Sequence, residues 1–262
     1  MNKIIIFILS AVFYVSGFAT TVGNPLNPEI IEEGFFISPT SWINFRVGYE
    51  GDFISDARLY NALQKGKIDN FKKDINSGTL TLNFQNRMDV FGVVGEGRIR
   101  SDWRFENLNA VSRLQLESNY RLYWAAGAKV ILFQWCNTAL STGGRYTFMK
   151  PSISYITIDG IPQDKGNSRI KSKDWQIDLG LAHRIDLFIP FIGVKYLNAK
   201  ERVYDSPVVI SADNQNYVNM KNKDRFGIYA GCSLSNSKYF MLTVEARFID
   251  EEAISVSGDL KF

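Results

Sequence analysis

Apolar and polar residues alternate one by one along much of this chain. In the final stretch, "AISVSGDLKF", apolar side chains from Ile254 to Phe262 alternate with Ser255, Ser257, Asp259 and Lys261. Successive side chains of a β-strand point to opposite faces, so this period of two predicts a strand with one apolar and one polar face. Such a strand fits a half-buried sheet of a soluble protein, or a transmembrane β-barrel with its apolar face toward lipid.

Recurrence of this pattern favours the membrane barrel. Charged residues and glycines stand opposite apolar residues in segment after segment, as expected of a water-filled or charge-paired lumen. The pattern predicts ten strands, at Trp42–Phe53, Thr79–Gln85, Met88–Gly97, Tyr120–Gln134, Thr138–Lys150, Asp174–Arg184, Phe188–Lys200, Arg225–Ser235, Tyr239–Ile249 and Ala253–Phe262.

The connections between these strands give a second, independent argument. Four short ones, "QNRM", "QWCN", "RIDLF" and "SNSKY", fall on one side, and the long polar spacers at 54–78, 98–119, 151–173 and 201–224 fall on the other. The exception is the last pair of strands, which a tight outer turn at "DEE" joins. Outer-membrane barrels have short periplasmic turns and longer outer loops. Because spacers this long can conceal another hairpin, for example in "SRLQLES" or in "SISYITI", we expect an all-β, transmembrane antiparallel β-barrel of ten to fourteen strands.

The first nineteen residues, "MNKIIIFILSAVFYVSGFA", have the features of a secretory signal peptide: one lysine, a short apolar run and small residues before the cleavage point. We therefore expect a signal peptide at 1–19, a periplasmic N-terminal segment at 20–41 and the barrel at 42–262. The remaining chain has no apolar stretch near the roughly 18 residues that a spanning helix needs, which excludes a helical membrane protein.

Composition narrows the class of protein further. With 30 basic and 27 acidic residues the chain lacks the charge excess of a nucleic-acid-binding protein. An aromatic content of 14% suits the aromatic girdles of a membrane barrel, although an aromatic-rich sandwich core would also explain it. Cys136 and Cys232 are too few for a disulfide-built scaffold, and one bridge or two free thiols both remain open.

The charged residues on the polar phase are the candidate pore-lining groups. They are Arg46, Glu50, Asp52, Asp89, Arg121, Lys129, Arg145, Asp178, Lys195, Arg225, Glu245, Arg247, Asp259 and Lys261. Any one of them alone can instead form an ion pair that fills the interior. Together they predict an outer-membrane channel for small hydrophilic solutes and ions. The alternative is a structural or adhesive barrel that its own side chains plug.

Enzyme chemistry finds little support in the chain. A barrel hydrolase needs a general base near its outer rim, whereas the single histidine, His183, lies on the apolar phase beside a predicted periplasmic turn. The stretch "GEGRIR" lacks the third glycine and the helix of a dinucleotide site. We therefore expect no enzyme activity, no catalytic residues, no metal site and no cofactor.

Three stretches carry a resemblance to a known family: "GNPLNPEIIEEGFF" with "WINFRVGYEGDF", "TLTLNFQNRMDVFGVVGE", and the end of the chain from "RFGIYAGCSLS" onward. With "DLFIPFIGVKY" and "TVEARFIDE" in matching order, they resemble the chlamydial-type major outer membrane protein, a porin family. The resemblance implies a β-barrel of the outer membrane, a trimer, and passage of small solutes. This chain is shorter, and its two cysteines make the envelope cross-linking of cysteine-rich members doubtful.

The terminal Phe262 lies on the lipid-facing phase of the last predicted strand. A terminal aromatic residue at this position is the feature by which the barrel assembly machinery recognises bacterial outer-membrane proteins, as the family resemblance also suggests. We therefore expect Phe262 to be an assembly signal, with the barrel assembly machinery and outer-membrane lipid as partners.

Overall fold

The fold is described from a computed structural model of the chain. It covers residues 22–35, 41–61, 66–107, 110–205 and 217–262, so the expected signal peptide lies outside the described residues. Within these ranges no helix is long and apolar enough to cross a membrane.

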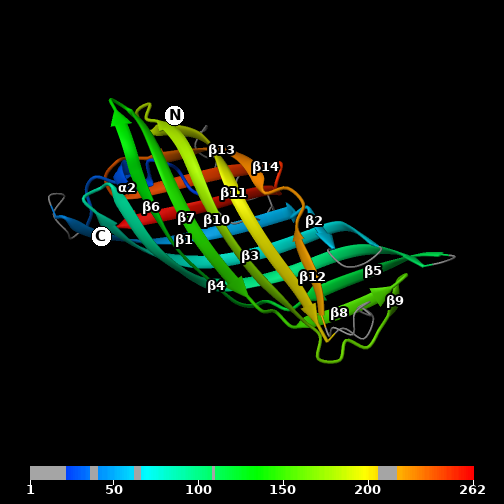
Figure 1. The fold of residues 1–262 in the computed structure, drawn as a ribbon. Helices are drawn as coiled ribbons and strands as arrows, with labels where there is room; N and C mark the ends of the chain where they lie inside the picture. The colour runs from blue at the N-terminus through cyan, green and yellow to red at the C-terminus, as the bar shows by residue number, and fades with distance from the viewer. Residues whose placement is uncertain (1–21, 36–40, 62–65, 108–109, 206–216) are drawn as a thin grey trace, which may run out of the picture.

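Ten antiparallel strands form a closed ring, which confirms the predicted barrel (Figure 1). Around the ring the order is β3, β1, β15, β14, β13, β11, β10, β7, β6 and β4, and pairing of β4 with β3 closes it. The strands are β1 (Ile43–Asp56), β3 (Gly66–Phe84), β4 (Met88–Asn107), β6 (Arg121–Trp135), β7 (Thr138–Met149), β10 (Arg169–His183), β11 (Phe188–Tyr204), β13 (Phe226–Ser235), β14 (Phe240–Phe248) and β15 (Glu252–Lys261). We refer to this ring as the membrane tier.

The two ends of the barrel differ. Tight turns join β3 to β4, β6 to β7, β10 to β11 and β13 to β14 at one end, where the C-terminus also lies (Figure 1, upper left). The longer connections project from the other end, together with the tight turn between β14 and β15. By the rule for outer-membrane barrels, the end with the tight turns is periplasmic and the other end is the outer one.

An apolar band encircles the membrane tier. On β10 the outward side chains run from His183 through leucines and an isoleucine to Trp175, and on β11 they run from Phe188 to Tyr196. Nine residues of strand at a tilt of 35–45° span about 23 Å along the membrane normal, close to the apolar height of about 25 Å in such barrels. Aromatic side chains mark its edges, among them Trp124, Tyr146, Trp175 and Phe226 toward the outside and Trp42, Trp135, Phe188 and Phe240 toward the periplasm.

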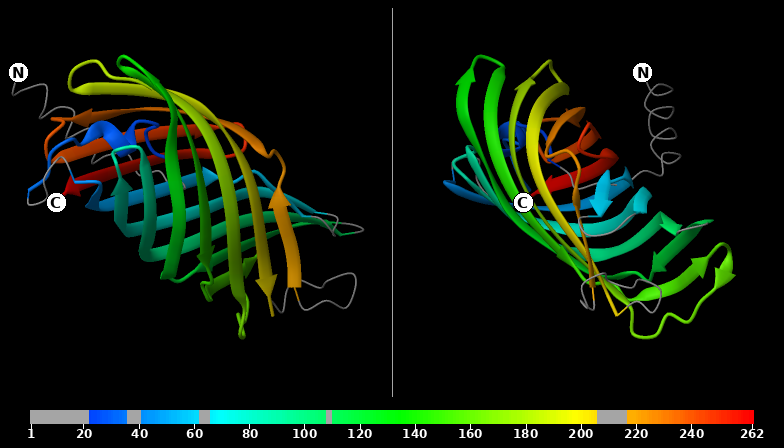
Figure 2. Two further views of the ribbon diagram at one scale, coloured as in Figure 1. Left: turned by 60° about the vertical axis from the view of Figure 1, so that its left-hand side comes forward. Right: turned by 45° about the vertical axis from the view of Figure 1, so that its right-hand side comes forward.

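Beyond the band the chain forms further strands instead of the expected loops. They are β2 (Leu59–Asn61), β5 (Ala110–Ser118), β8 (Ile153–Ile158), β9 (Ile161–Pro162) and β12 (Tyr217–Asn222). The stretches "SRLQLES" and "SISYITI" are strands, as anticipated, and the hairpins they take part in are β4–β5 and β8–β9. They also pair with each other across two spacers, with Leu116 opposite Ile156. β12 pairs with both β11 and β2. These additional strands, together with the outer ends of β3, β4, β10 and β11, form a second layer above the membrane tier, which we call the outer tier (Figure 2).

The prediction of loops at 54–78, 98–119, 151–173 and 201–224 was therefore wrong over much of its length. β3 begins at Gly66 and β4 ends at Asn107, both well outside the predicted strands. The cause is that the apolar and polar faces of these strands exchange sides beyond the membrane. Above the membrane the outward face meets water and carries charges such as Arg98 and Arg100, while the inward face is apolar, as with Ile99 and Trp103.

The inward apolar side chains of the outer tier form one cluster. It includes Ile54, Phe71, Ile75, Ile99, Trp103, Leu114, Leu116, Ile156, Leu197, Val203 and Met220, all buried. A ring of about eight strands has an interior that side chains can fill. The outer tier thus closes the outer end of the barrel with a hydrophobic core.

Candidate functional site in the barrel lumen

The polar phase of the membrane tier points into the lumen, as the alternation predicts. Of the fourteen candidate pore-lining residues, eleven are buried in the interior: Arg46, Glu50, Asp52, Asp89, Lys129, Arg145, Asp178, Lys195, Glu245, Arg247 and Lys261. Asp259 is half-buried. Arg121 and Arg225 are exposed, and Arg225 donates a hydrogen bond to the outward-facing Tyr196, so the structure does not bring these two into the lumen.

Buried ion pairs occupy the middle of the lumen. Arg145 holds Glu50 through two parallel hydrogen bonds of 2.8 and 3.1 Å, a bidentate geometry that adds direction as well as energy. Arg247 contacts Asp52 at 3.1 Å and Glu245 at 3.0 Å. Because each charge has a partner, the cost of removing it from water is offset.

Two further groups of lumen charges include residues outside the fourteen candidates. Lys195 pairs with Asp250, at 3.0 Å, and with Glu251, both from the tight "DEE" turn between β14 and β15. Nearer the outside, Lys73 lies 2.7 Å from Asp174 and 2.6 Å from Glu201. Lys73 and Glu201 belong to expected spacers and Asp174 begins a predicted strand. Continuing the inward phase beyond the band would have placed all three in the lumen.

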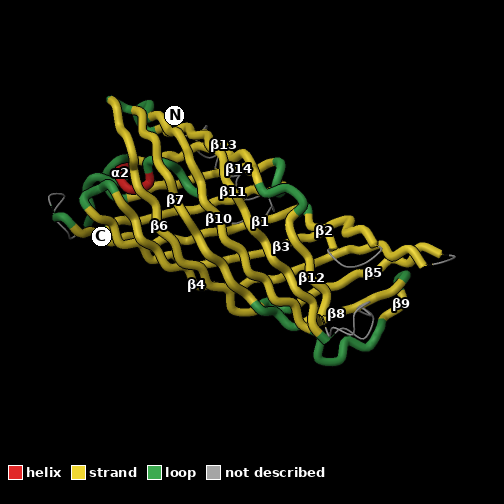
Figure 3. The backbone as a smooth tube through the Cα atoms, viewed as in Figure 1, coloured by secondary structure: helices red, strands yellow, loops and turns green. Residues whose placement is uncertain are grey.

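The segment of residues 22–35 lies in the periplasmic half of the barrel, with residues 22–31 inside the lumen and Glu32 and Phe35 exposed at its rim. Its short helix α2 (Asn27–Ile30) is visible there in red in Figure 3. Two prolines and no regular alternation keep this segment from joining the wall. Leu26, Ile30 and Ile31 are buried against apolar side chains of the lower barrel. The sequence predicts a periplasmic segment for 20–41, and its described part is this lumen segment.

Charged wall residues hold the backbone of the lumen segment. The Lys129 ammonium group donates to the carbonyl oxygens of Val22 and Gly23, each at 2.7 Å. The carboxylate of Glu245 accepts from the amide groups of the same two residues, at 2.9 and 2.8 Å. The two wall residues therefore bind both the carbonyl and the amide groups of this dipeptide.

The rest of the segment is held in the same way. Lys261 donates to the carbonyl of Ile31 at 2.7 Å, Arg46 donates to that of Asn27, and Asn83 donates to that of Pro28 at 2.8 Å. The bonds from Lys261 and Arg46 have charged donors and are worth about 1.5–3 kcal/mol each. Wall charges predicted to line a pore therefore bind protein backbone.

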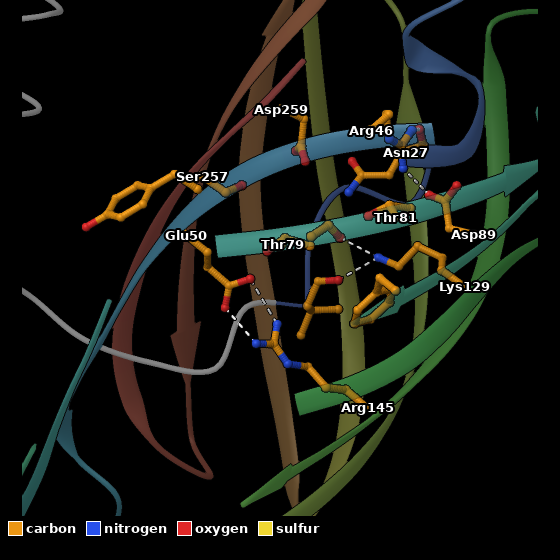
Figure 4. A pocket seen from close by; sticks show the side chains of 14 residues that line it. Asn27, Arg46, Glu50, Thr79, Thr81, Asp89, Lys129, Arg145, Ser257 and Asp259 are labelled. Carbon is orange, nitrogen blue, oxygen red and sulfur yellow. Dashed lines mark hydrogen bonds and ion pairs between the residues drawn. The ribbon is translucent and has the colours of Figure 1, made fainter. Parts of the chain in front are cut away.

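Between the segment and the wall a cavity of about 60 Å³ remains. Figure 4 shows its charged lining, with Glu50 and Arg145 pointing at each other, Lys129 reaching toward the segment and Arg46 beside Asp89. This volume has room for a few water molecules. With the lumen segment in place, the structure holds water-sized space here, smaller than a hydrophilic solute.

The remaining candidate residues lie at the periphery. Cys136, in the β6–β7 turn, and Cys232, on the lipid-facing side of β13, are both free thiols, so the bridged alternative does not hold. His183 is exposed beside Thr138, 2.7 Å away. Phe262 stacks on Phe45, with ring centroids 5.5 Å apart, in the aromatic edge at the periplasmic end.

Across the described ranges no group of three or more histidine, cysteine or acidic side chains is arranged to hold a metal ion. The lumen chemistry consists of ion pairs and backbone hydrogen bonds. This arrangement can pass ions and polar solutes if the lumen segment moves, or it can brace the wall if the segment stays.

Comparison with known proteins gives relatives of one kind. The chain is 23% identical to the major outer membrane porin, serovar F, of Chlamydia trachomatis over 377 aligned positions, covering 93% of this chain and 95% of the relative. The serovar E porin of the same species matches at 23% over 372 positions, with the same coverage. No family model matches the chain.

Solved structures that align with this fold are also outer-membrane proteins. An outer membrane channel from Pseudomonas putida F1 aligns with 86% of this chain and all of its own, at 11% identity and a TM-score of 0.43. OprG from Pseudomonas aeruginosa aligns with 84% of this chain and 95% of its own, at 11% identity and a TM-score of 0.38. The closed ring, its apolar band and the porin relatives together make this chain an integral β-barrel protein of the bacterial outer membrane.

Proposed function

We propose that this protein is a narrow porin-type channel for small hydrophilic solutes and ions, described here in a closed state. The observation that carries the proposal is the lumen segment: the groups that bind it are the charged residues that would line a pore. The names of the relatives agree with this proposal.

The contacts that hold the lumen segment are of a kind that a gate can break and re-form. Many of the segment's polar contacts are backbone hydrogen bonds that Lys129, Lys261 and Arg46 donate and that Glu245 accepts, and water can replace each of them. When the segment leaves, these side chains face a hydrated passage through the lower half of the barrel. The cost of release is then the loss of those bonds and of the apolar contacts of Ile30 and its neighbours.

The outer end needs a second opening step. The hydrophobic cluster of the outer tier stands between the lumen and the outside, and a hydrophobic constriction conducts only when it is wetted. Ten strands also enclose a narrower space than the 16 to 18 strands of open porins. The channel is therefore expected to have small conductance and frequent closures.

The same cluster favours a second candidate function, a plugged structural barrel. Its core and the buried pairs around Arg145 and Arg247 would then serve only to stiffen the wall. Under this alternative, solutes never cross the barrel.

Reconstitution into a planar lipid bilayer distinguishes the two candidates. The wild-type protein is compared with a variant that lacks residues 22–35, and both are first checked for a folded band on an unheated detergent gel. The channel proposal expects small, brief steps from the wild type and longer open times from the variant. Two folded proteins that never conduct would refute the proposal and leave the structural barrel.

A further inference from the structure

Three lysines stand side by side on the outward face of neighbouring strands. Lys173 of β10 is directly opposite Lys200 of β11, and Lys200 is directly opposite Lys221 of β12. All three are exposed. Cross-strand neighbours have Cβ atoms about 4.5–5.5 Å apart, and like charges at this spacing repel each other. We call these residues the lysine row.

Nearby side chains add positive charge. Lys171 and Arg202 face each other one step further out, and Arg202 donates to the side chain of Asn219. The acidic residues next to the row in sequence, Asp174 and Glu201, point inward and pair with Lys73. Within the described ranges, no ion pair joins the lysine row to a carboxylate.

The opposite flank of the outer tier behaves differently. On β3, β4 and β5 the outward arginines have acidic partners: Arg98 contacts Asp74 at 2.5 Å, and Arg113 contacts Asp102. On the flank of the lysine row, Arg169 at the outer end of β10 also pairs with Asp205, at 3.4 Å, and Lys173 lies over the ring of Phe148 at 5.8 Å. Among the described residues, the three lysines of the row are left without an acidic partner. A charge row that destabilises the free sheet indicates an external anion as its counterpart.

The height of the lysine row identifies that anion. Trp175, at the outer edge of the apolar band, follows Lys173 by two residues on β10, which is about 5 Å along the membrane normal at the tilt of such strands. The headgroup zone of a bilayer is about 5–7 Å deep on each side. The three ammonium groups therefore lie at the level of the phosphates in the outer leaflet.

We propose that the lysine row binds the phosphate groups of the phosphorylated glycolipid that forms the outer leaflet. Lysine ammonium groups are mobile point charges that suit phosphate, and three of them in line match a lipid headgroup that carries two phosphates. Trp175 and Tyr196, below the row, offer aromatic faces to the acyl chains. The site lies on the outside of the wall and is independent of conduction through the lumen.

The test measures lipid binding by native mass spectrometry of the folded protein in a neutral detergent, titrated with bisphosphorylated lipid A. The row variant carries Lys173→Gln, Lys200→Gln and Lys221→Gln. Each lysine near an anionic surface is worth about 1 kcal/mol, or about five-fold in Kd, so we expect the row variant to bind on the order of 100-fold more weakly.

A matched control removes the same charge elsewhere. Arg87, Lys165 and Lys238 are exposed and lie outside the row, and their replacement by glutamine should leave the Kd within about two-fold of wild type. Lipid A stripped of its phosphates should bind wild type and row variant equally weakly. Equal binding of intact lipid A by both proteins, or wild-type affinity that does not depend on the phosphates, would overturn the proposal.

The repulsion premise has its own readout. In lipid-free micelles the row variant should melt at the same temperature as the wild type or above it, because three uncompensated like charges have been removed. A lower Tm would mean that the lysines stabilise the sheet by themselves, and the argument for an external anion would fail.

Discussion

Replacing Lys129 by methionine should loosen the lumen segment without opening the barrel wall. The change removes the two 2.7 Å hydrogen bonds from the ammonium group to Val22 and Gly23 and keeps a side chain of similar length. A hydrogen bond to a charged group contributes about 1.5–3 kcal/mol. The docked segment should therefore lose at least about 3 kcal/mol, which is a shift of about 100-fold in its release equilibrium.

Hydrogen exchange of the segment amides measures that shift directly. The amides of Val22 and Gly23 are bonded to Glu245 and should be protected in the wild type. Because local opening governs their exchange while the barrel stays folded, protection should fall by about 100-fold in Lys129→Met. Lys195→Met is the control: Lys195 is equally buried but pairs with Asp250 and Glu251, away from the segment. Unchanged protection in Lys129→Met, or an equal loss in both variants, would refute the reasoning.

Three other predictions concern the whole barrel. Deleting Phe262 should lower the outer-membrane fraction while export across the inner membrane is unchanged, as cell fractionation measures; equal outer-membrane yield would contradict an assembly role. The ring leaves no free edge, and an unsatisfied backbone group in lipid costs several kcal/mol, so unheated protein should migrate differently from boiled protein on a mild detergent gel, and identical mobility would count against closure. Ion selectivity should be weak, because the twelve candidate lining residues that face the lumen divide evenly by sign. It should favour cations slightly, because the four acidic groups around Lys73 and Lys195 outnumber these two lysines. A reversal potential near the ideal value for either ion, measured in a tenfold salt gradient, would contradict this prediction.

Counted by sign, the fourteen sequence candidates comprise eight basic and six acidic residues and would predict a slight preference for anions instead. Arg121 and Arg225 lie outside the lumen, and Glu201 with its neighbours lies inside it. The alternation identifies a lumen residue only where the outward face meets lipid. At strand ends, and beyond the membrane, that contrast is lost.

The membrane tier was predictable because every strand that crosses lipid must present apolar side chains on its outward face, which makes apolar and polar residues alternate. All ten strands follow that rule, and the predicted bounds miss mainly at the outer ends, as on β3 and β4. The lumen segment was not predictable in this way. Its conformation depends on contacts with Lys129, Glu245 and Lys261, which are far away in sequence, and "NPLNPEIIEEG" contains no period that reveals them.

Because the two tiers are stacked, one of them can in principle be removed by protein engineering while the other is kept. Residue pairs at membrane height close the ring by themselves, and β2, β5, β8, β9 and β12 are all insertions between strands of that ring. Tight hairpins in place of these insertions and of the outer ends of the ring strands would remove the hydrophobic core above the lumen and leave a bare ten-stranded cylinder. Without the lumen segment as well, the chain would become a small scaffold for a designed nanopore, with a bore already lined by paired charges.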